Sequence, residues 1–270
     1  MIDFLCHIQA NGMYRYARYS CICADSLIRN GGVRPDQIHV WLGENMDTEP
    51  ARVLERMGCV LMPEVSGKTK LGMLSKTFHV DAPPCTLLFD ADMIVQPGVN
   101  IPDLVNRYRD AFVVVHPTGV PYIPAFYDRL ENWVKPHPLL LEMLGMTIEK
   151  IADMNKNEEW HWGSFYLVNQ RTRGTRFWEL MTLGNEWCCL DDELLQSIFR
   201  WIDPGKLHVM KNDVMQVFAS KLPEQLNMKG CFLHYAGNEL KDKFDALINT
   251  IYREVVARVL YGGAETRLFL

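Results

Sequence analysis

The chain has 270 residues, 48% of them hydrophobic and 23% charged, and its formal net charge at pH 7 is −5. This length suits one large α/β domain or at most two small ones. The acidic balance gives no support for a nucleic-acid partner held by a broad basic surface, although a local basic groove is compatible with it. No apolar run approaches the length of a membrane span, and Met1 to Leu5 lead into a predicted strand without a basic start and an apolar signal core. We therefore expect a cytoplasmic protein.

The eight cysteines support the same compartment. They are spread through apolar segments and include no C-x-x-C pair. The spacings in Cys21-Ile22-Cys23 and Cys188-Cys189 are poor for a tetrahedral zinc site. Buried free thiols are the favoured interpretation, and they fit a reducing environment.

The first third of the chain alternates between predicted strands and helices. Strands are predicted at 2–8, 38–42, 59–62 and 86–89, and helices at 13–29, 49–57 and 70–80. This order favours a mainly parallel sheet covered by helices. Ligands bind at the carboxyl ends of strands in such sheets, so Gln9 and Asn11 are candidate nucleotide contacts, with a polar turn as the alternative. Neither G-x-G-x-x-G nor G-x-x-x-x-G-K-[ST] follows the first strand, which disfavours a dinucleotide dehydrogenase or a P-loop enzyme.

Two aspartates, Asp90 and Asp92, follow the fourth predicted strand. Apolar residues flank them on both sides, at 87–89 and at 93–95. Two carboxylates this close at the end of a buried strand repel each other unless they share a cation. Hard oxygen ligands select Mg²⁺ or Mn²⁺, ions that keep positions open for water and for nucleotide phosphates. The segment predicts a divalent metal site, and a helix cap or a solvated turn is the alternative.

The second half of the chain mixes further elements with one long segment that we expect to be irregular. Helices are predicted at 100–110, at 177–182 and from about 190 to 199 or 201. Strands are predicted at 111–116, 207–210, 214–218 and 231–237, and one more strand follows Trp162 and ends at 168. Residues 117–156 are rich in proline and aromatic residues, and long loops of this kind commonly carry substrate contacts. The rings of Trp160 and Trp162 suit sugar faces and Gly163 would let a ligand approach the backbone, although ordinary core aromatics would give the same pattern.

Two further segments complete the set of candidates. Asp191, Asp192 and Glu193 begin a predicted helix, where acids also favour the helix dipole without any other role. The helix predicted at 244–259 is amphipathic, and we interpret it as core or as the surface of a homodimer rather than as a membrane anchor. We find no internal repeat, low-complexity segment or clear linker, so a single domain over residues 1–270 is expected.

Four features, taken together, resemble one enzyme family. They are the apolar segment around Asp90 and Asp92 in mid-chain, Lys76 one helix upstream, the stretch 161–165 followed by the acids 191–193, and His234-Tyr235-Ala236-Gly237 with Lys241 soon after. Their order resembles that of the metal-dependent, nucleotide-sugar glycosyltransferases of GT-A fold, and is similar to the glycogenin and galactosyltransferase group classed as family 8. The fourth feature looks like that family's H-[FY]-x-G-x-x-K motif.

The resemblance implies an α/β, Rossmann-like GT-A fold with a mixed, mainly parallel sheet flanked by helices. It implies a nucleotide-binding half over about 1–100, and a sugar and acceptor half with the C-terminal helix over about 101–270. The metal ligands it implies are Asp90, Asp92 and His234, with Asp90 contacting the ribose as well or acting through water. The candidate donor contacts are Gln9 and Asn11, from their place after the first strand, and those that the resemblance implies, Lys76, Asp90, Gly163, Gly237 and Lys241. The implied catalytic residues are Asp191 and Asp192.

The late motif departs from the family pattern in two ways. The interval from His234 to Lys241 is one residue longer than usual, and Asp242-Lys243 replaces the usual proline and tryptophan. Both Lys241 and Lys243 are therefore candidates for contact with the donor diphosphate.

The function that these features imply is a glycosyltransferase of hexosyltransferase type. With Mn²⁺ or Mg²⁺, it would move a sugar from a nucleoside-diphosphate sugar, with a UDP-sugar as first choice, to an acceptor hydroxyl with retention. Glycans, proteins, lipids and hydroxylated bases in DNA all remain open as acceptors. The alternatives are a non-catalytic GT-A-like binding domain, a sugar nucleotidyltransferase, whose Gly-rich basic early loop is absent, and a DXD phosphatase, whose motif normally stands on the first strand.

Overall fold

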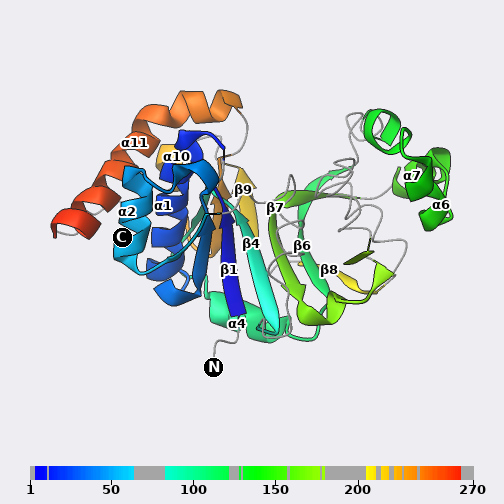
Figure 1. The fold of residues 1–270 in the computed structure, drawn as a ribbon, viewed down its shortest axis with the longest axis horizontal. Coiled ribbons are helices and arrows are strands. Elements are labelled where there is room, and N and C mark those ends of the chain that lie inside the picture. The colour runs from blue at the N-terminus through cyan, green and yellow to red at the C-terminus, as the bar shows by residue number, and fades with distance from the viewer. Residues whose placement is uncertain are drawn as a thin grey trace. The chain divides into compact units, whose positions relative to one another are not determined.

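The structure is a computed structural model, and its residues fall into two compact units. It describes residues 4–10, 12–63, 83–121, 128, 130–156, 159–176, 178–179, 205–210, 214–218, 222–226, 228–235 and 238–262 (Figure 1). One unit comprises 1–65, 86–108 and 212–270, and the other comprises 66–85 and 109–211. The described strands form a seven-stranded mixed sheet and a three-stranded sheet. The predicted α/β class, with a mainly parallel sheet flanked by helices, is confirmed.

The first unit is built on parallel strands that the sequence predicted closely. Their order is β3-β2-β1-β4, and their bounds are Phe4–Gln9 for β1, Ile38–Trp41 for β2, Val60–Met62 for β3 and Cys85–Asp90 for β4. The register pairs Cys6 with Ile38 and His39 with Val60. Phe89 and the two leucines before it are fully buried, as expected of a strand covered on both faces.

Three helices of this unit pack against one another. They are α1 (Tyr14–Arg29), α2 (Glu49–Met57) and α11 (Asn238–Tyr261), which lie side by side in Figure 1. Gly58 ends α2 in the left-handed conformation, at φ 91°, as the sequence predicts. The helix α11 begins six residues ahead of the predicted 244, because its polar first turns carry no apolar periodicity.

Contacts along their length show that α1 and α11 run parallel. Near their amino ends, Nη1 of Arg15 lies 3.7 Å from Oδ1 of Asp242. Farther along, Arg18 donates a hydrogen bond to Asn249. In the second half of both helices, Nη2 of Arg258 lies 2.7 Å from Oδ1 of Asp25, which is only 3% exposed. The two helices therefore begin at the same end of the unit.

The three-stranded sheet joins the middle of the chain to its last third. It consists of β5 (Met93–Val95), β10 (Cys231–His234) and β9 (Met215–Phe218), with β10 antiparallel to β5 and parallel to β9. Side chains of Ser26 in α1 and of Asn30, the residue that follows α1, bind the other edge of β5. The Val95 amide donates to Oγ of Ser26 at 3.0 Å, and Asn30 Nδ2 donates to the Val95 carbonyl at 2.7 Å. These two hydrogen bonds satisfy the backbone amide and carbonyl of Val95 on the side of the short strand β5 that faces away from β10.

His7 on β1 is a buried histidine held by a neighbouring strand. Trp41 Nε1 donates to its Nδ1 at 2.9 Å, and the residue is 1% exposed. Burial, with a smaller effect of nearby His39, lowers the pKa of His7 to about 3. His7 is therefore neutral in the folded protein at neutral pH.

In the second unit, the segment that we expected to be irregular contains regular structure. The strands β7 (Glu159–Asn169), β6 (Val113–Pro121) and β8 (Leu207–Val209) lie in this order, with β7 antiparallel to β6. Three short helices follow β6: the π-helix η3 (Leu130–Val134), α6 (Pro138–Leu144) and α7 (Ile148–Asn155). The prediction for 117–156 is thus wrong in part. Local signals outweigh the proline content, because Pro138 begins α6, Gly145 ends it and the Thr147 side chain caps α7.

The remaining short elements connect the strands. They are the 3₁₀ turns η1 (Pro35–Gln37), η2 (Gly43–Asn45) and η4 (Gln170–Thr172), and the helices α4 (Ile101–Arg107) and α10 (Leu222–Gln225). The predicted helices at 70–80 and 190–201 lie outside the described residues, as does most of the one at 177–182. Among the described helices, none has the length and apolar character needed to cross a bilayer.

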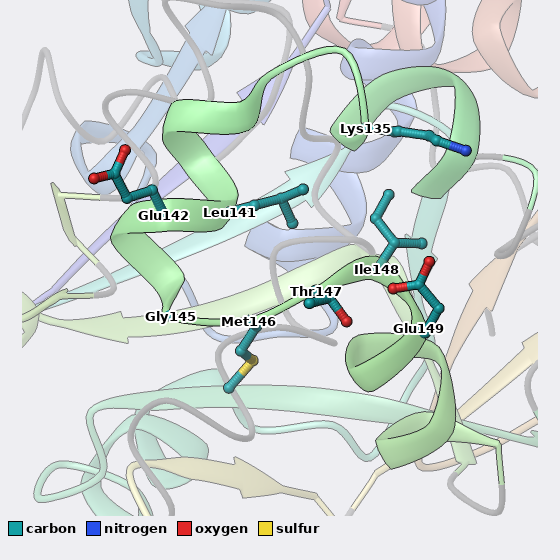
Figure 2. A pocket seen from close by; sticks show the side chains of 8 residues that line it. All are labelled: Lys135, Leu141, Glu142, Gly145, Met146, Thr147, Ile148 and Glu149. Carbon is teal, nitrogen blue, oxygen red and sulfur yellow. The ribbon is translucent and has the colours of Figure 1, made fainter.

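A shallow pocket of about 600 Å³ lies beside α6 and α7 in the second unit. It is lined by Lys135, Leu141, Glu142, Gly145, Met146, Thr147, Ile148 and Glu149, and Figure 2 shows Leu141 directed toward Ile148. None of these lining residues, all of them described, is aromatic, so the pocket lacks the flat rings on which sugars pack. It also contains none of the predicted site residues.

Candidate metal centre

The two aspartates lie at a turn between two buried strands. Asp90 is the last residue of β4, Asp92 precedes β5, and Ala91 between them is 2% exposed. The β5 residues pair with β10, so the turn is fixed on the side of Asp92 by backbone hydrogen bonds. Both carboxylates are thus carried on short, well-anchored backbone.

The strand β10 brings His234 to this turn. His234 lies opposite Met93 in the antiparallel register, and the amide of Tyr235 donates to the Asp92 carbonyl at 3.2 Å. The imidazole therefore lies beside residues far away in the sequence because β5 and β10 are neighbours.

The three side chains converge tightly. Nε2 of His234 lies 3.3 Å from Oδ1 of Asp92 and 3.7 Å from Oδ2 of Asp90. One ligand atom from each residue can be chosen so that all three lie within 4.8 Å of one another. The side chains of Asp92 and His234 are 6% exposed, whereas that of Asp90 is 28% exposed. The cluster therefore opens to solvent on the side of Asp90.

This donor set fits a divalent cation. Two carboxylate oxygens and one imidazole nitrogen suit first-row divalent ions. Three protein ligands leave coordination positions open for water or phosphate oxygens. Among the described residues, this is the one group of three such side chains that could hold a metal ion.

Buried groups that carry no charge lie near the carboxylates of the cluster. The rings of Tyr19 on α1 and Tyr235 meet edge to face with centroids 5.3 Å apart, and Tyr235 is fully buried. Burial, and then the nearby Asp92 carboxylate, raise the pKa of Tyr235 well above its ordinary value. Burial also raises the pKa of the Cys23 thiol, with contributions from Cys6 and then Asp92. Both groups stay uncharged at neutral pH, so they supply no charge to balance the carboxylates.

The structure thus brings together Asp90, Asp92 and His234, the three predicted ligands. Gln9 is the last residue of β1, at the strand end where we expected it. Gly163 lies in β7 of the second unit and Lys241 in the first turn of α11, but the Lys241 side chain is not among those described. The other predicted site residues, Asn11, Lys76, Asp191, Asp192 and Gly237, lie outside the described residues. Their roles stay predictions.

Sequence reasoning missed Tyr19 on α1, whose ring meets that of Tyr235, the residue after His234. Tyr235 stands in the late motif, but its packing against α1 had no local signal, because the two residues are far apart in the sequence.

Comparison with known proteins gives matches at the level of structure. The chain matches no protein-family model and no curated protein sequence. It is similar to mouse xyloside xylosyltransferase 1 in its apo form, with a TM-score of 0.53 and 12% identity over 88% of this chain and 98% of that chain. It is also similar to the galactosyltransferase LgtC in complex with donor and acceptor sugar analogs, with a TM-score of 0.50 and 13% identity over 93% and 95%.

A third similar structure has a different reaction in its name. It is a Bacillus anthracis protein assigned as a glucose-1-phosphate thymidylyltransferase, in complex with sucrose, with a TM-score of 0.50 and 12% identity over 91% of this chain and 95% of that chain. Sequence identities this low bear on the fold and leave the activity open. The fold of this chain is therefore the Rossmann-like GT-A fold, which it shares with glycosyltransferases and with a nucleotidyltransferase.

Proposed function

We propose that the chain is a metal-dependent glycosyltransferase that moves a sugar from a nucleoside-diphosphate sugar to an acceptor hydroxyl. The observation that carries this proposal is the convergence of Asp90, Asp92 and His234 in a GT-A fold. In this cluster, two carboxylates lie within 4.8 Å of an imidazole, and one of them, that of Asp90, is open to solvent. A cluster with only a structural role would not need this arrangement. Bringing two like charges together is costly unless a cation offsets them.

The three residues would hold Mn²⁺, or Mg²⁺ as second choice. The imidazole ligand favours Mn²⁺, since Mg²⁺ prefers oxygen ligands in near-ideal octahedral geometry. When bound, the ion would neutralise the diphosphate leaving group, whose negative charge grows as the bond to the sugar breaks. His234 and Asp92 would fix its position from the buried side, and Asp90 from the solvent side.

The remaining roles complete the proposal. Lys241 or Lys243 and Lys76 would pair with the donor diphosphate, for which a UDP-sugar is the first candidate. Asp191 and Asp192 would hold sugar or acceptor hydroxyls. With retention of configuration, the leaving phosphate would take the acceptor proton; with inversion, one of these acids would act as base.

The cysteines support action in the cytoplasm. The six cysteines among the described residues are all free and buried, at Cys6, Cys21, Cys23, Cys59, Cys85 and Cys231. Buried thiols remain reduced in the cytoplasm, where structural disulfides are rare.

A thermal-shift screen of nucleoside diphosphates and nucleotide sugars, with and without Mn²⁺, tests the proposal. A ligand at one hundred times its dissociation constant stabilises the folded state by about 2.7 kcal/mol. For a chain of this size that is a rise in Tm of roughly 5–10 °C. We expect the rise with UDP or a UDP-sugar in Mn²⁺, and none in EDTA or in His234→Ala. If no nucleotide raises Tm in the presence of either metal, the proposal is wrong.

A sugar nucleotidyltransferase is the second candidate, because the thymidylyltransferase from Bacillus anthracis has a similar fold. The two reactions differ in their products. A nucleotidyltransferase releases pyrophosphate from a nucleoside triphosphate and a sugar phosphate, whereas a glycosyltransferase releases a nucleoside diphosphate from a nucleotide sugar. A coupled pyrophosphate assay therefore separates them.

A further inference from the structure

The helix α1 contacts both strands that adjoin the candidate metal cluster. Its Tyr19 ring meets the ring of Tyr235, which follows His234 at the end of β10. Two turns later along α1, Oγ of Ser26 accepts a hydrogen bond at 3.0 Å from the amide of Val95, the last residue of β5. Residues seven positions apart lie on the same face of a helix, so one face of α1 reaches both strands.

The two sides of β5 bind different elements. The Asp92 carbonyl accepts from the residue after β10 at 3.2 Å, and the Gln96 amide donates to a carbonyl of β10 at 3.0 Å. Val95 faces the opposite way, because successive residues of a strand direct their backbone groups to opposite sides. Its amide donates to Ser26, and its carbonyl accepts from Nδ2 of Asn30 at 2.7 Å. The strand that directly follows Asp92 is therefore held between α1 and β10.

The contact between Ser26 and Val95 lies in the interior of the first unit. Ser26 is 3% exposed and Val95 is fully buried. A buried amide that has no acceptor is costly, so without this oxygen β5 would shift until the Val95 amide found another partner. Asp92 stands directly before β5, and its Oδ1 lies 3.3 Å from Nε2 of His234. A shift of the strand would therefore change the spacing of these two side chains.

From these contacts we infer that Ser26 and Asn30 are positioning residues for the metal cluster. By fixing β5 against α1, they hold Asp92 at the distance from His234 at which both can bind one cation. The inference rests on the proposed function. Ligands that are already in place bind an ion more tightly than ligands that must first be ordered, because less conformational freedom is lost on binding. Ser26 and Asn30 act through the backbone of β5.

Two serines of α1 form a matched pair for the test. Ser20 and Ser26 are both buried, and each donates its hydroxyl to the carbonyl three residues before it, at 2.8 Å. Ser26 also accepts from the Val95 amide, whereas no described hydrogen bond joins Ser20 to β5. The variants Ser26→Ala and Ser20→Ala thus remove the same group from the same helix, and they differ in the contact with β5.

Two measurements are made at a temperature well below the Tm of each variant, so that a loss of stability alone changes neither. Hydrogen exchange by NMR in EDTA follows the Tyr235 amide, which donates to the Asp92 carbonyl. The electron paramagnetic resonance signal of free Mn²⁺ gives the Kd of the ion. In Ser26→Ala, the Tyr235 amide should exchange faster. Mn²⁺ should bind roughly three- to tenfold more weakly, a smaller loss than for a group that hydrogen-bonds a ligand directly. Ser20→Ala should keep both wild-type values.

The outcomes separate this inference from the proposed function. If the wild-type protein binds Mn²⁺ and Ser26→Ala has the same Kd, the inference is wrong and the proposed function stands, even when the Tyr235 amide exchanges faster. Equal losses of Mn²⁺ affinity in Ser26→Ala and Ser20→Ala also overturn it. If the wild-type protein binds no Mn²⁺, both fall together. Should Ser26→Ala fail to fold, Asn30→Ala replaces it, because Asn30 is only half-buried, and unchanged Mn²⁺ binding by that variant overturns the inference.

Discussion

Replacing Asp92 with asparagine should make the metal-free protein more stable and remove its stabilisation by Mn²⁺. The ligand atoms of Asp90 and Asp92 lie within 4.8 Å of each other. Two unit charges at that separation repel by about 3 kcal/mol at an effective dielectric constant of about 20. The variant also weakens the contact of Asp92 with His234, a loss of about 1 kcal/mol. The net gain of about 2 kcal/mol should raise the Tm of the metal-free protein by roughly 4–8 °C.

The assay is thermal unfolding at pH 8 in EDTA and in Mn²⁺. The wild-type protein should have the lower Tm in EDTA and a higher one in Mn²⁺, whereas Asp92→Asn should be high in EDTA and insensitive to the ion. Asp153→Asn, which neutralises an exposed acid of α7, is the matched control and should behave as the wild type. An Asp92→Asn protein that is less stable than the wild type in EDTA, or that still responds to Mn²⁺, would refute the reasoning.

Three further predictions concern other parts of the chain. Acidification should destabilise the protein through His7, because its folded pKa of about 3 is below the unfolded value of 6.5 and the unfolded state takes up the proton first. The loss of unfolding free energy begins below pH 6.5 and reaches about 2 kcal/mol at pH 5. Urea unfolding of His7→Gln should show a smaller loss over the same pH range. Arg258→Ala should lower the free energy of unfolding, measured in urea, by about 3–5 kcal/mol, because it leaves Asp25 buried without the arginine that pairs with it. Adding Asp25→Asn should recover most of that loss. A double variant as unstable as the single one would contradict this. Lys241→Ala should weaken UDP binding more than Mn²⁺ binding in calorimetry, and a neutral result would assign the diphosphate contact to Lys243.

Much of the first unit could be predicted because its signals are local. The helix α2 has the predicted bounds, since a proline near its start and Gly58 at its end are both visible in the sequence. The strand β4 is an apolar run that ends at a carboxylate, so both its burial and its end could be predicted. For these elements, the hydrophobic periodicity and the residues that begin and end helices and strands were sufficient for prediction.

The site itself depended on information that periodicity does not contain. The contact of His234 with Asp92 follows from the antiparallel pairing of β10 with β5, a long-range pairing for which a single sequence holds no local signal. The resemblance in motif order predicted these three residues as ligands, and the structure places one ligand atom of each within 4.8 Å of the others. Their role as metal ligands stays a prediction. The position of Arg15 beside Asp242 could not be predicted, because it depends on the parallel packing of α1 and α11.

The proposed metal ligands come from distant parts of the chain, and this has a consequence during synthesis of the protein. The ribosome delivers Asp90 and Asp92 long before the strand that carries His234, so the nascent chain holds two acids without their imidazole until β10 has emerged. Domains synthesised in this order must postpone part of their folding. Metal capture at the proposed site would therefore be a late event, and a chain that stops before β10 would retain two neighbouring acids without the imidazole that completes the proposed site.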